Sequence, residues 1–224
     1  MGPAHEAILD LPVSVAAGDG GRLFFFDQAN QLVRVVQDDQ VVDVAGSQRD
    51  HGYSGDGEHA SLTQFHATTG QTAGPANKID VQDDLVLVAD TQNQVVRQLD
   101  LVSGITETLA GRRECDVDGR CVGEDVKGDG AGPADEVGLR YPVDVAFGPD
   151  GIVYVADTLN HCVRAIQDGW SEPIAGTCGV EGYDGDEGPA DEALLSRPEG
   201  ISVDGEGNVY IADTYNHVIR VVHP

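Results

Sequence analysis

Carboxylates gathered in glycine-rich stretches are the residues of this chain with the clearest capacity for chemistry. Three acids lie within Asp50–Glu58, and pairs of aspartates follow at Asp116 and Asp118 and at Asp184 and Asp186. Loops that offer several carboxylate and carbonyl oxygens on a flexible backbone suit hard cations such as Ca²⁺. None of these stretches matches the twelve-residue calcium loop that ends in a bidentate glutamate. Two interpretations therefore stay open for the four paired aspartates: a calcium site, or solvated turns.

The histidines indicate a metal site less clearly than the carboxylates do. His51, His59 and His66 share one stretch and could bind a transition metal, whereas His161 and His217 belong to a repeated turn. No nucleophile elbow, phosphate-binding loop or His-Glu-x-x-His pair occurs in the sequence. The chain therefore contains no recognisable catalytic signature.

The four cysteines are placed as two pairs. Cys115 and Cys121 bracket a turn within one polar stretch, a common setting for a local disulfide. Cys162 and Cys178 fall roughly opposite each other around a hairpin at Asp168, within bridging reach if the register holds. The spacing C-x-x-C, which would favour a metal, is absent. Two disulfides are predicted, and they imply an oxidising compartment, periplasmic or extracellular.

One eight-residue motif occurs four times, at intervals of 56 to 67 residues. Every copy keeps an Asp, an Asn three residues later and an Arg seven residues later, while the residues between them vary. The members are Asp27, Asn30, Arg34, Asp90, Asn93, Arg97, Asp157, Asn160, Arg164, Asp213, Asn216 and Arg220. Repetition at such intervals predicts one supersecondary unit copied along the chain.

Each copy of the motif lies between two apolar runs that predict β-strands. The runs before it are Leu23–Phe26, Leu85–Ala89, Ile152–Ala156 and Val209–Ala212. The runs after it are Leu32–Val36, Val95–Leu99, Cys162–Ile166 and Val218–Val222. The first runs are apolar at every position, which is typical of strands covered on both faces.

The motif residues have predicted structural roles at this hairpin. The Asn tolerates a left-handed backbone and can cap the turn with its side chain. If Phe25 pairs with Arg34, then Asp27 and Arg34 lie on one sheet face as diagonal neighbours. We therefore interpret Asp and Arg as a strut between two strands. A ring of Asp–Arg pairs acting as a ligand site is the disfavoured alternative, because sites are rarely copied four times unaltered.

Further strands complete each unit. A shorter strand precedes the hairpin at Val13–Ala17, Ile79–Val81, Asp144–Phe147 and Ile201–Asp204. A fourth strand, closed by Ala-Gly, follows at Val41–Ala45, Ile105–Ala110 and Pro173–Ala175. Four antiparallel strands per unit, stacked radially, define a propeller blade. The predicted fold is an all-β propeller over residues 1–224, with blades near 12–46, 76–111, 142–176 and 198–224 and connectors at 47–75, 112–141 and 177–197.

The third and fourth units resemble the NHL-repeat family. Asp157-Thr-Leu-Asn-His161 and Asp213-Thr-Tyr-Asn-His217 carry the likeness, with Val-Tyr-Val-Ala or Val-Tyr-Ile-Ala before them and Arg after. The loop Gly182–Ala190, before a strand led by Pro198, is similar to the bacterial branch of that family. The resemblance covers nearly the whole chain. It implies a β-propeller that most often has six blades, so four blades could form part of a larger ring.

The two ends of the sequence predict an incomplete last blade. Gly2–Pro12 aligns without a gap on Gly188–Pro198, so the first residues are expected to be a connector with a helical turn. The sequence stops directly after the third strand of the fourth blade. That blade is therefore predicted to lack its outer strand. Because an unpaired strand edge invites another chain, we expect a piece of a longer protein or a chain that borrows strands.

The net charge of −26 limits the classes of partner. Nucleic-acid binders place clustered Lys and Arg against the phosphates, and this chain has only 13 basic residues against 39 acidic ones. No apolar run is long enough to span a membrane. A divalent cation or a basic protein partner suits such a surface.

The central channel is where a propeller enzyme would hold its catalytic groups. Its predicted lining residues are Ser14, Asp80, Asp144, Ser202 and Asp204. Peptide-amidating lyases and lactonases resemble this fold and use channel-lining side chains around zinc or calcium, which makes Asp144 the candidate ligand here. We favour a non-enzymatic scaffold whose acidic connectors bind a protein or that self-associates through its incomplete blade. The alternative is a metal-dependent lyase or lactonase-like enzyme.

Overall fold

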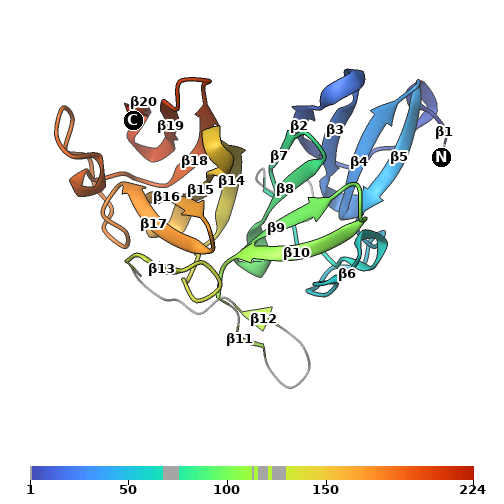
Figure 1. Cartoon of the computed structure of the whole chain (residues 1–224), viewed down its shortest axis with the longest axis horizontal. Coiled ribbons are helices and arrows are strands. Elements are labelled where there is room, and N and C mark those ends of the chain that lie inside the picture. The colour runs from blue at the N-terminus through green and yellow to red at the C-terminus, as the bar shows by residue number, and fades with distance from the viewer. Residues whose placement is uncertain (1, 68–75, 113, 116–120, 123–129) are drawn as a thin grey trace.

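Four antiparallel sheets follow one another around an arc in the computed structural model of the chain (Figure 1). The structure describes residues 2–67, 76–112, 114–115, 121–122 and 130–224. The first strands of successive sheets lie against one another: β2 (Pro12–Ala17) contacts β7 (Ile79–Gln82), which contacts β14 (Pro142–Phe147). β18 (Pro198–Val203) then contacts β14. The sheets are the blades of a propeller, so the predicted fold class is confirmed.

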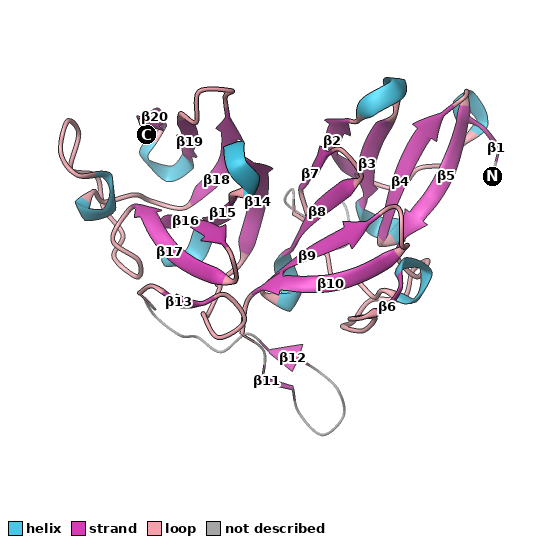
Figure 2. Cartoon of the chain, in the orientation of Figure 1, coloured by secondary structure: helices cyan, strands magenta, loops and turns pink. Residues whose placement is uncertain are grey.

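Three blades contain four long strands and the last contains three (Figure 2). Blade 1 continues through β3 (Leu23–Asp27), β4 (Leu32–Gln37) and β5 (Gln40–Ala45). Blade 2 continues through β8 (Leu85–Asp90), β9 (Val95–Asp100) and β10 (Ile105–Ala110). Blade 3 continues through β15 (Val153–Asp157), β16 (Cys162–Gln167) and β17 (Trp170–Ala175). In the described part of the chain, blade 4 has β19 (Val209–Asp213) and β20 (Val218–Val222) after β18 and no fourth strand.

Some strands begin up to three residues earlier than predicted. β18 starts at Pro198 and not at Ile201, and β17 starts at Trp170 and not at Pro173. A register shift between Pro198 and Gly200 explains the first difference, because the strand pairs on both sides of a bulge. Proline is tolerated there because it begins the strand.

Short elements lie in the connectors and turns. The short strands are β1 (Gly2–Pro3), β6 (Glu58–His59), β11 (Glu114–Cys115), β12 (Cys121–Val122) and β13 (Gly132–Pro133). The 3-10 turns are η1 (Ala4–Glu6), η2 (Asp19–Gly21), η3 (Gln28–Asn30), η4 (Ala60–Leu62), η5 (Thr91–Asn93), η6 (Pro149–Gly151), η7 (Thr158–Asn160), η8 (Ala190–Glu192) and η9 (Thr214–Asn216). β1 pairs with β5, and β13 pairs with β17. Connector residues that precede a blade therefore extend the outer edge of that same blade.

The turn within each motif is built differently from the prediction. Its Asn occupies the last position of a 3-10 turn, and the left-handed residue is the next one: Gln31, Gln94, His161 or His217, with φ near 58° or 59°. The predicted left-handed Asn was therefore wrong. The Asn keeps right-handed geometry because its amide must reach back to the carboxylate at the start of the turn.

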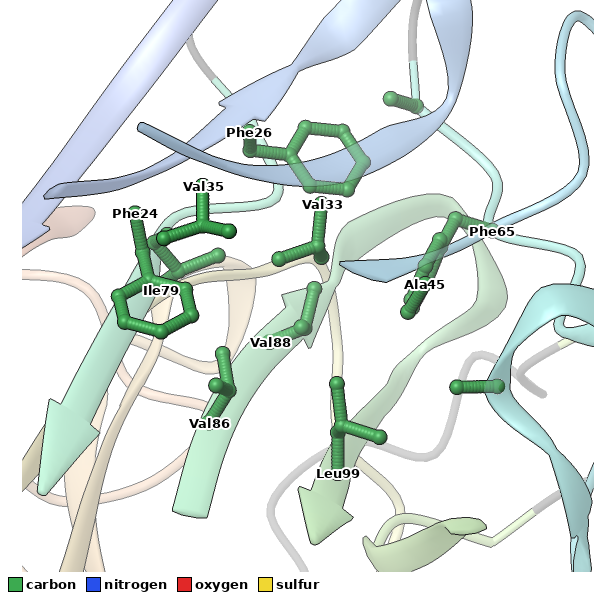
Figure 3. Packing of buried hydrophobic residues seen from close by; sticks show 12 residues of the cluster. Phe24, Phe26, Val33, Val35, Ala45, Phe65, Ile79, Val86, Val88 and Leu99 are labelled. Atoms are coloured by element: carbon green, nitrogen blue, oxygen red, sulfur yellow. The ribbon is translucent and has the colours of Figure 1, made fainter. Parts of the chain in front are cut away.

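Three apolar cores lie between successive blades. Figure 3 shows the first, in which Phe24, Phe26 and Val33 of blade 1 face Val86 and Val88 of blade 2. Leu87 and Val96 of blade 2 enter the second core, and Tyr154 and Val163 of blade 3 enter the third. The strands are apolar at consecutive positions because one face packs on the preceding blade and the other on the following blade.

Candidate functional site

The motif carboxylate joins three segments in every blade. One oxygen of Asp27, Asp90, Asp157 and Asp213 accepts a backbone N–H from the connector, at 2.7 to 2.9 Å. The other oxygen accepts the amide N–H of the motif Asn at 2.8 or 2.9 Å. All four carboxylates are fully buried. Buried charges are stabilised only where such partners surround them.

The motif Arg approaches the same carboxylate at two distances. Arg34 and Arg164 lie 2.8 Å from Asp27 and Asp157. In blades 2 and 4 the distances are longer, 3.8 Å from Arg97 to Asp90 and 3.7 Å from Arg220 to Asp213. The arginine in those two blades is held by a second carboxylate from the preceding connector.

That second carboxylate belongs to an aspartate of the acidic connectors. Asp56 lies 3.0 Å from Arg97, and Asp186 lies 2.7 Å from Arg220. Tyr53 and Tyr183 place their rings over the same guanidiniums, at 4.7 and 5.8 Å from the ring centroids. The sequence analysis did not predict that a connector Asp and Tyr hold the motif Arg in blades 2 and 4. The signal for this contact was present as Gly-Tyr-Ser-Gly-Asp and Gly-Tyr-Asp-Gly-Asp, repeated in two connectors.

Burial shifts the pKa values of several motif and connector groups. Desolvation raises the pKa of Asp90 to about 6, against the lowering effect of Arg97 and Asn93. Burial also raises the pKa of Asp157. The pKa of Tyr53 rises to about 12, first through burial and then through its hydrogen bond to Asp56. The groups with these shifted pKa values hold strands and connectors together inside the fold.

Polar residues of the first strands connect neighbouring blades. Ile79 donates its N–H to Ser14 Oγ at 3.1 Å, and Phe147 donates to Asp80 at 2.8 Å. Asp144 accepts from Ile201 N–H at 2.9 Å and lies 3.2 Å from Lys78 Nζ. Burial raises the pKa of both aspartates. Each of the three side chains thus bonds to the next blade along the arc.

The other two predicted channel residues differ from these. Asp204 lies after β18 and closes its own turn by accepting N–H groups from Glu206 and Asn208. Ser202 is exposed on β18. The prediction that Asp204 ends the inner strand was wrong, because its carboxylate is used by the turn that follows.

Of the connector aspartates predicted to bind a metal, two take other partners and two are not described. Asp184 accepts the N–H of Gly185, while Asp186 pairs with Arg220. Asp116 and Asp118 lie outside the described residues. Within the described ranges, no three side chains of His, Cys, Asp or Glu gather closely enough to hold a metal ion.

The three connector histidines do not form one cluster. His51 and His66 are neighbours, with ring centroids 5.3 Å apart, and burial lowers the pKa of His66. His59 instead bonds Ser61 at the start of η4.

A disulfide joins Cys162 to Cys178, with 5.1 Å between their Cα atoms. It links the start of β16 to the segment after β17 and confirms the predicted bridge in blade 3. The backbones of Cys115 and Cys121 pair across β11 and β12, while their side chains lie outside the described part. Over the described segments, no helix has the length and apolar character needed to cross a membrane.

Among the described residues no strand pairs with the outer edge of β20, and this edge borders a groove of about 750 Å³. One wall is β20 itself, from Val218 to Val222. The opposite wall is the connector from Tyr183 to Leu195. The groove occupies the place that β5, β10 and β17 fill in the other blades. It combines an apolar floor, formed by Ala175 and Leu195, with unpaired backbone groups.

The chain belongs to the NHL-repeat family. The model of the Teneurin NHL domain matches residues 2–167, and the NHL repeat model matches residues 195–222. The chloroplastic protein SUPPRESSOR OF QUENCHING 1 of Arabidopsis thaliana is 30% identical over 174 residues, which are 76% of this chain and 16% of that protein. NHL repeat-containing protein 2 of Homo sapiens is 27% identical over 144 residues, 61% of this chain and 18% of that protein.

Solved structures share the fold at low sequence identity. A Bacteroides thetaiotaomicron protein of unknown function superposes with a TM-score of 0.66 at 20% identity, covering 94% of this chain and 46% of that one. An auxiliary nutrient binding protein of the same organism gives 0.60 at 17%, covering 93% and 46%. This chain therefore spans 16% and 18% of the two relatives and about half of these structures.

Proposed function

We propose that this chain is a non-enzymatic scaffold that binds an extended protein segment along β20, as the fourth strand of blade 4. The observation that carries the proposal is the unpaired outer edge of β20 beside the groove. A strand edge offers its backbone N–H and C=O groups to an added strand, while neighbouring pockets select alternate side chains.

The other three blades define the segment that fits. In blade 3 the fourth strand reads Trp-Ser-Glu-Pro-Ile-Ala-Gly, with Ser171 and Ala175 buried. A Cβ on Gly176 would lie 2.6 Å from the carbonyl oxygen of His161, so the final position requires glycine. The equivalent carbonyl in blade 4 belongs to His217. Ser171 corresponds to Thr106 in blade 2 and Val41 in blade 1, which are also buried. The partner is therefore an extended segment with a buried small or β-branched residue near its start and Ala-Gly at its end.

Charge and location add to this description of the partner. Asp186 is paired with Arg220, but Glu187 also borders the groove and the chain carries a net charge of −26, so a segment flanked by basic residues is favoured. The Cys162–Cys178 bond supports a periplasmic or extracellular location. The bonds from Asp80 and Asp144 to the following blades support a scaffold over a metal-dependent lyase or lactonase.

A peptide copied from blade 3 tests the proposal. We expect a labelled peptide of residues 169–177 to bind saturably by fluorescence anisotropy and to protect the amides of residues 218–222 from hydrogen exchange. The same peptide with Gly176→Val should bind at least about tenfold more weakly, because its side chain would overlap the carbonyl. Equal binding of both peptides, or protection confined to residues outside β20, contradicts strand addition.

A further inference from the structure

Blade 4 presents an exposed apolar sheet face on the side turned away from blade 3. Tyr210, Ile219 and Val221 form this surface, with exposed fractions of 42%, 70% and 43%. Tyr210 is paired with Val221, and Ala212 with Ile219, so their side chains share one face of the sheet. We call these residues the open face of blade 4. It adjoins the β20 edge proposed above to bind an extended segment, and Ile219 and Val221 also line the groove at that edge.

The same positions are buried in the other blades. Ile219 corresponds to Val33, Val96 and Val163, which are fully buried between blades. Tyr210 corresponds to Phe24, Leu87 and Tyr154, and these also lie in the cores between blades. The open face of blade 4 is therefore one half of a core that this chain builds three times.

Blade 1 exposes the other half of such a core. Val15 and Leu23 are exposed by 69% and 42% on the side of blade 1 turned away from blade 2. Their equivalents in blade 3, Val145 and Val153, are buried against blade 2. The molecule thus carries both complementary halves, one at each end of its arc.

Residues equivalent to those that form hydrogen bonds across the junction between blades 3 and 4 also occur at the two ends of the arc. Between blades 3 and 4, Thr158 donates to the carbonyl of Pro198 at 2.7 Å, and Arg197 N–H donates to His161 Nδ1 at 3.2 Å. In blade 4 the side chain equivalent to His161 is that of His217, which is exposed. In blade 1 the residue equivalent to Arg197 is Leu11, and its φ of 55° is close to the 47° of Arg197.

We infer that the open face of blade 4 packs against blade 1 of a second copy of this chain. The contact is heterologous, because one surface meets a different surface of the partner copy, so copies associate head to tail. The five apolar residues at the contact carry no charge, whereas each copy carries −26 overall. Association is therefore expected to strengthen as salt screens the repulsion.

Paired surface variants test this contact on the full chain. We expect wild-type protein in about 0.15 M salt to exceed its 23.6 kDa monomer mass in light scattering between about 1 μM and about 1 mM protein. Ile219→Glu and Val15→Glu should each lower the mass to that of the monomer. Val102→Glu, a change at an even more exposed apolar residue in the turn between β9 and β10, should leave it unchanged.

Mixing the two variants separates head-to-tail contact from other modes. Each variant keeps one intact half, so the mixture should form dimers that neither variant forms alone. This recovery also shows that both variants are folded. Three results would overturn the inference. The wild-type protein could stay monomeric at every concentration, Ile219→Glu could lower the mass while Val15→Glu does not, or the mixed variants could form no dimers. Ile219 also lines the β20 groove, whereas Val15 lies in β2 outside it. The Val15→Glu variant therefore tests this contact without altering the peptide site, so this contact and the proposed function fail separately.

Discussion

At the scale of single residues, the repeated carboxylate is the centre of each blade. Asp157 shows the full set: its oxygens accept bonds from the connector backbone, from Asn160 and from Arg164. In blade 2 the arrangement is looser, because Arg97 lies 3.8 Å from Asp90 and closer to Asp56. The same three residue types therefore provide different electrostatic support in different blades.

The raised pKa of Asp90 predicts a pH dependence of stability. The carboxyl titrates near 3.8 when unfolded and near 6 when folded. Between these values the folded state binds more protons, so the free energy of unfolding falls as pH rises. Relative to Asp90→Asn, which cannot titrate, wild-type protein should lose on the order of 2–3 kcal/mol between pH 4 and pH 7. Urea unfolding of both proteins across this range measures the difference.

The Asp90→Asn variant serves as the internal control, because all other titrating groups are common to the two proteins. A difference in free energy of unfolding that stays constant from pH 4 to pH 7 would show that Asp90 ionises in the fold as easily as in water.

At the scale of elements, the end of each fourth strand depends on one glycine. Gly46, Gly111 and Gly176 have positive φ, and an added Cβ would lie 2.3 to 2.6 Å from the carbonyl of the left-handed turn residue. This close approach lets the chain leave the outer strand and cross to the next blade. The Ala-Gly ending recognised in the sequence therefore has a steric cause.

Two glycines that flank β17 provide a matched test. Gly169 and Gly176 have φ of 75° and 81°, but only Gly176 has atoms within 4 Å of an added Cβ. Gly169→Ala should cost about 1 kcal/mol through backbone strain alone. Gly176→Ala should cost about 1–3 kcal/mol more, because it also overlaps His161 and Leu195. Chemical denaturation compares the two, and similar losses would refute the steric explanation.

At the scale of the whole molecule, acidic residues dominate the surface while two of the arginines lie inside the fold. Arg97 and Arg164 are fully buried and neutralise motif carboxylates. Most of the excess charge of −26 therefore remains on the surface, where the charges repel one another. This repulsion destabilises the compact state and is reduced by salt.

Screening should consequently stabilise the fold. Raising NaCl from about 10 mM to about 100 mM shortens the Debye length from about 30 Å to about 10 Å. We expect the melting temperature to rise by about 2–4 °C, which corresponds to about 1 kcal/mol for a chain of this size. Calorimetry measures the shift, and an unchanged or lower melting temperature contradicts it.

Divalent ions extend this test to the calcium hypothesis. If Asp184 and Asp186 act only within the connector, then CaCl₂ and MgCl₂ at about 1 mM should raise the melting temperature equally. A rise confined to calcium would instead indicate a specific site.

The sequence alone determined the repeating parts of this protein. The Asp–Asn–Arg motif and the apolar runs beside it predicted four blades, because strand pairing within a blade joins residues close in sequence. Ala-Gly endings and the alignment of Gly2–Pro12 with later connectors predicted which blade has three strands. The positions of Cys162 and Cys178, opposite each other in blade 3, followed from the register of the hairpin at Asp168.

Only the tertiary structure decided which partners the acidic residues take. Asp56 reaches Arg97 and Asp144 reaches Lys78 and Ile201 because connectors fold over the outer strands and the inner strands of successive blades touch. The Asp56–Arg97 pair joins residues 41 positions apart, between a connector and the blade that follows it. The Asp144 contacts join residues 57 and 66 positions apart and depend on the angle between blades, which no local pattern encodes. The exposure of Ile219 and Val15 likewise follows from their places at the two ends of the arc, because equivalent residues elsewhere are buried by a neighbouring blade.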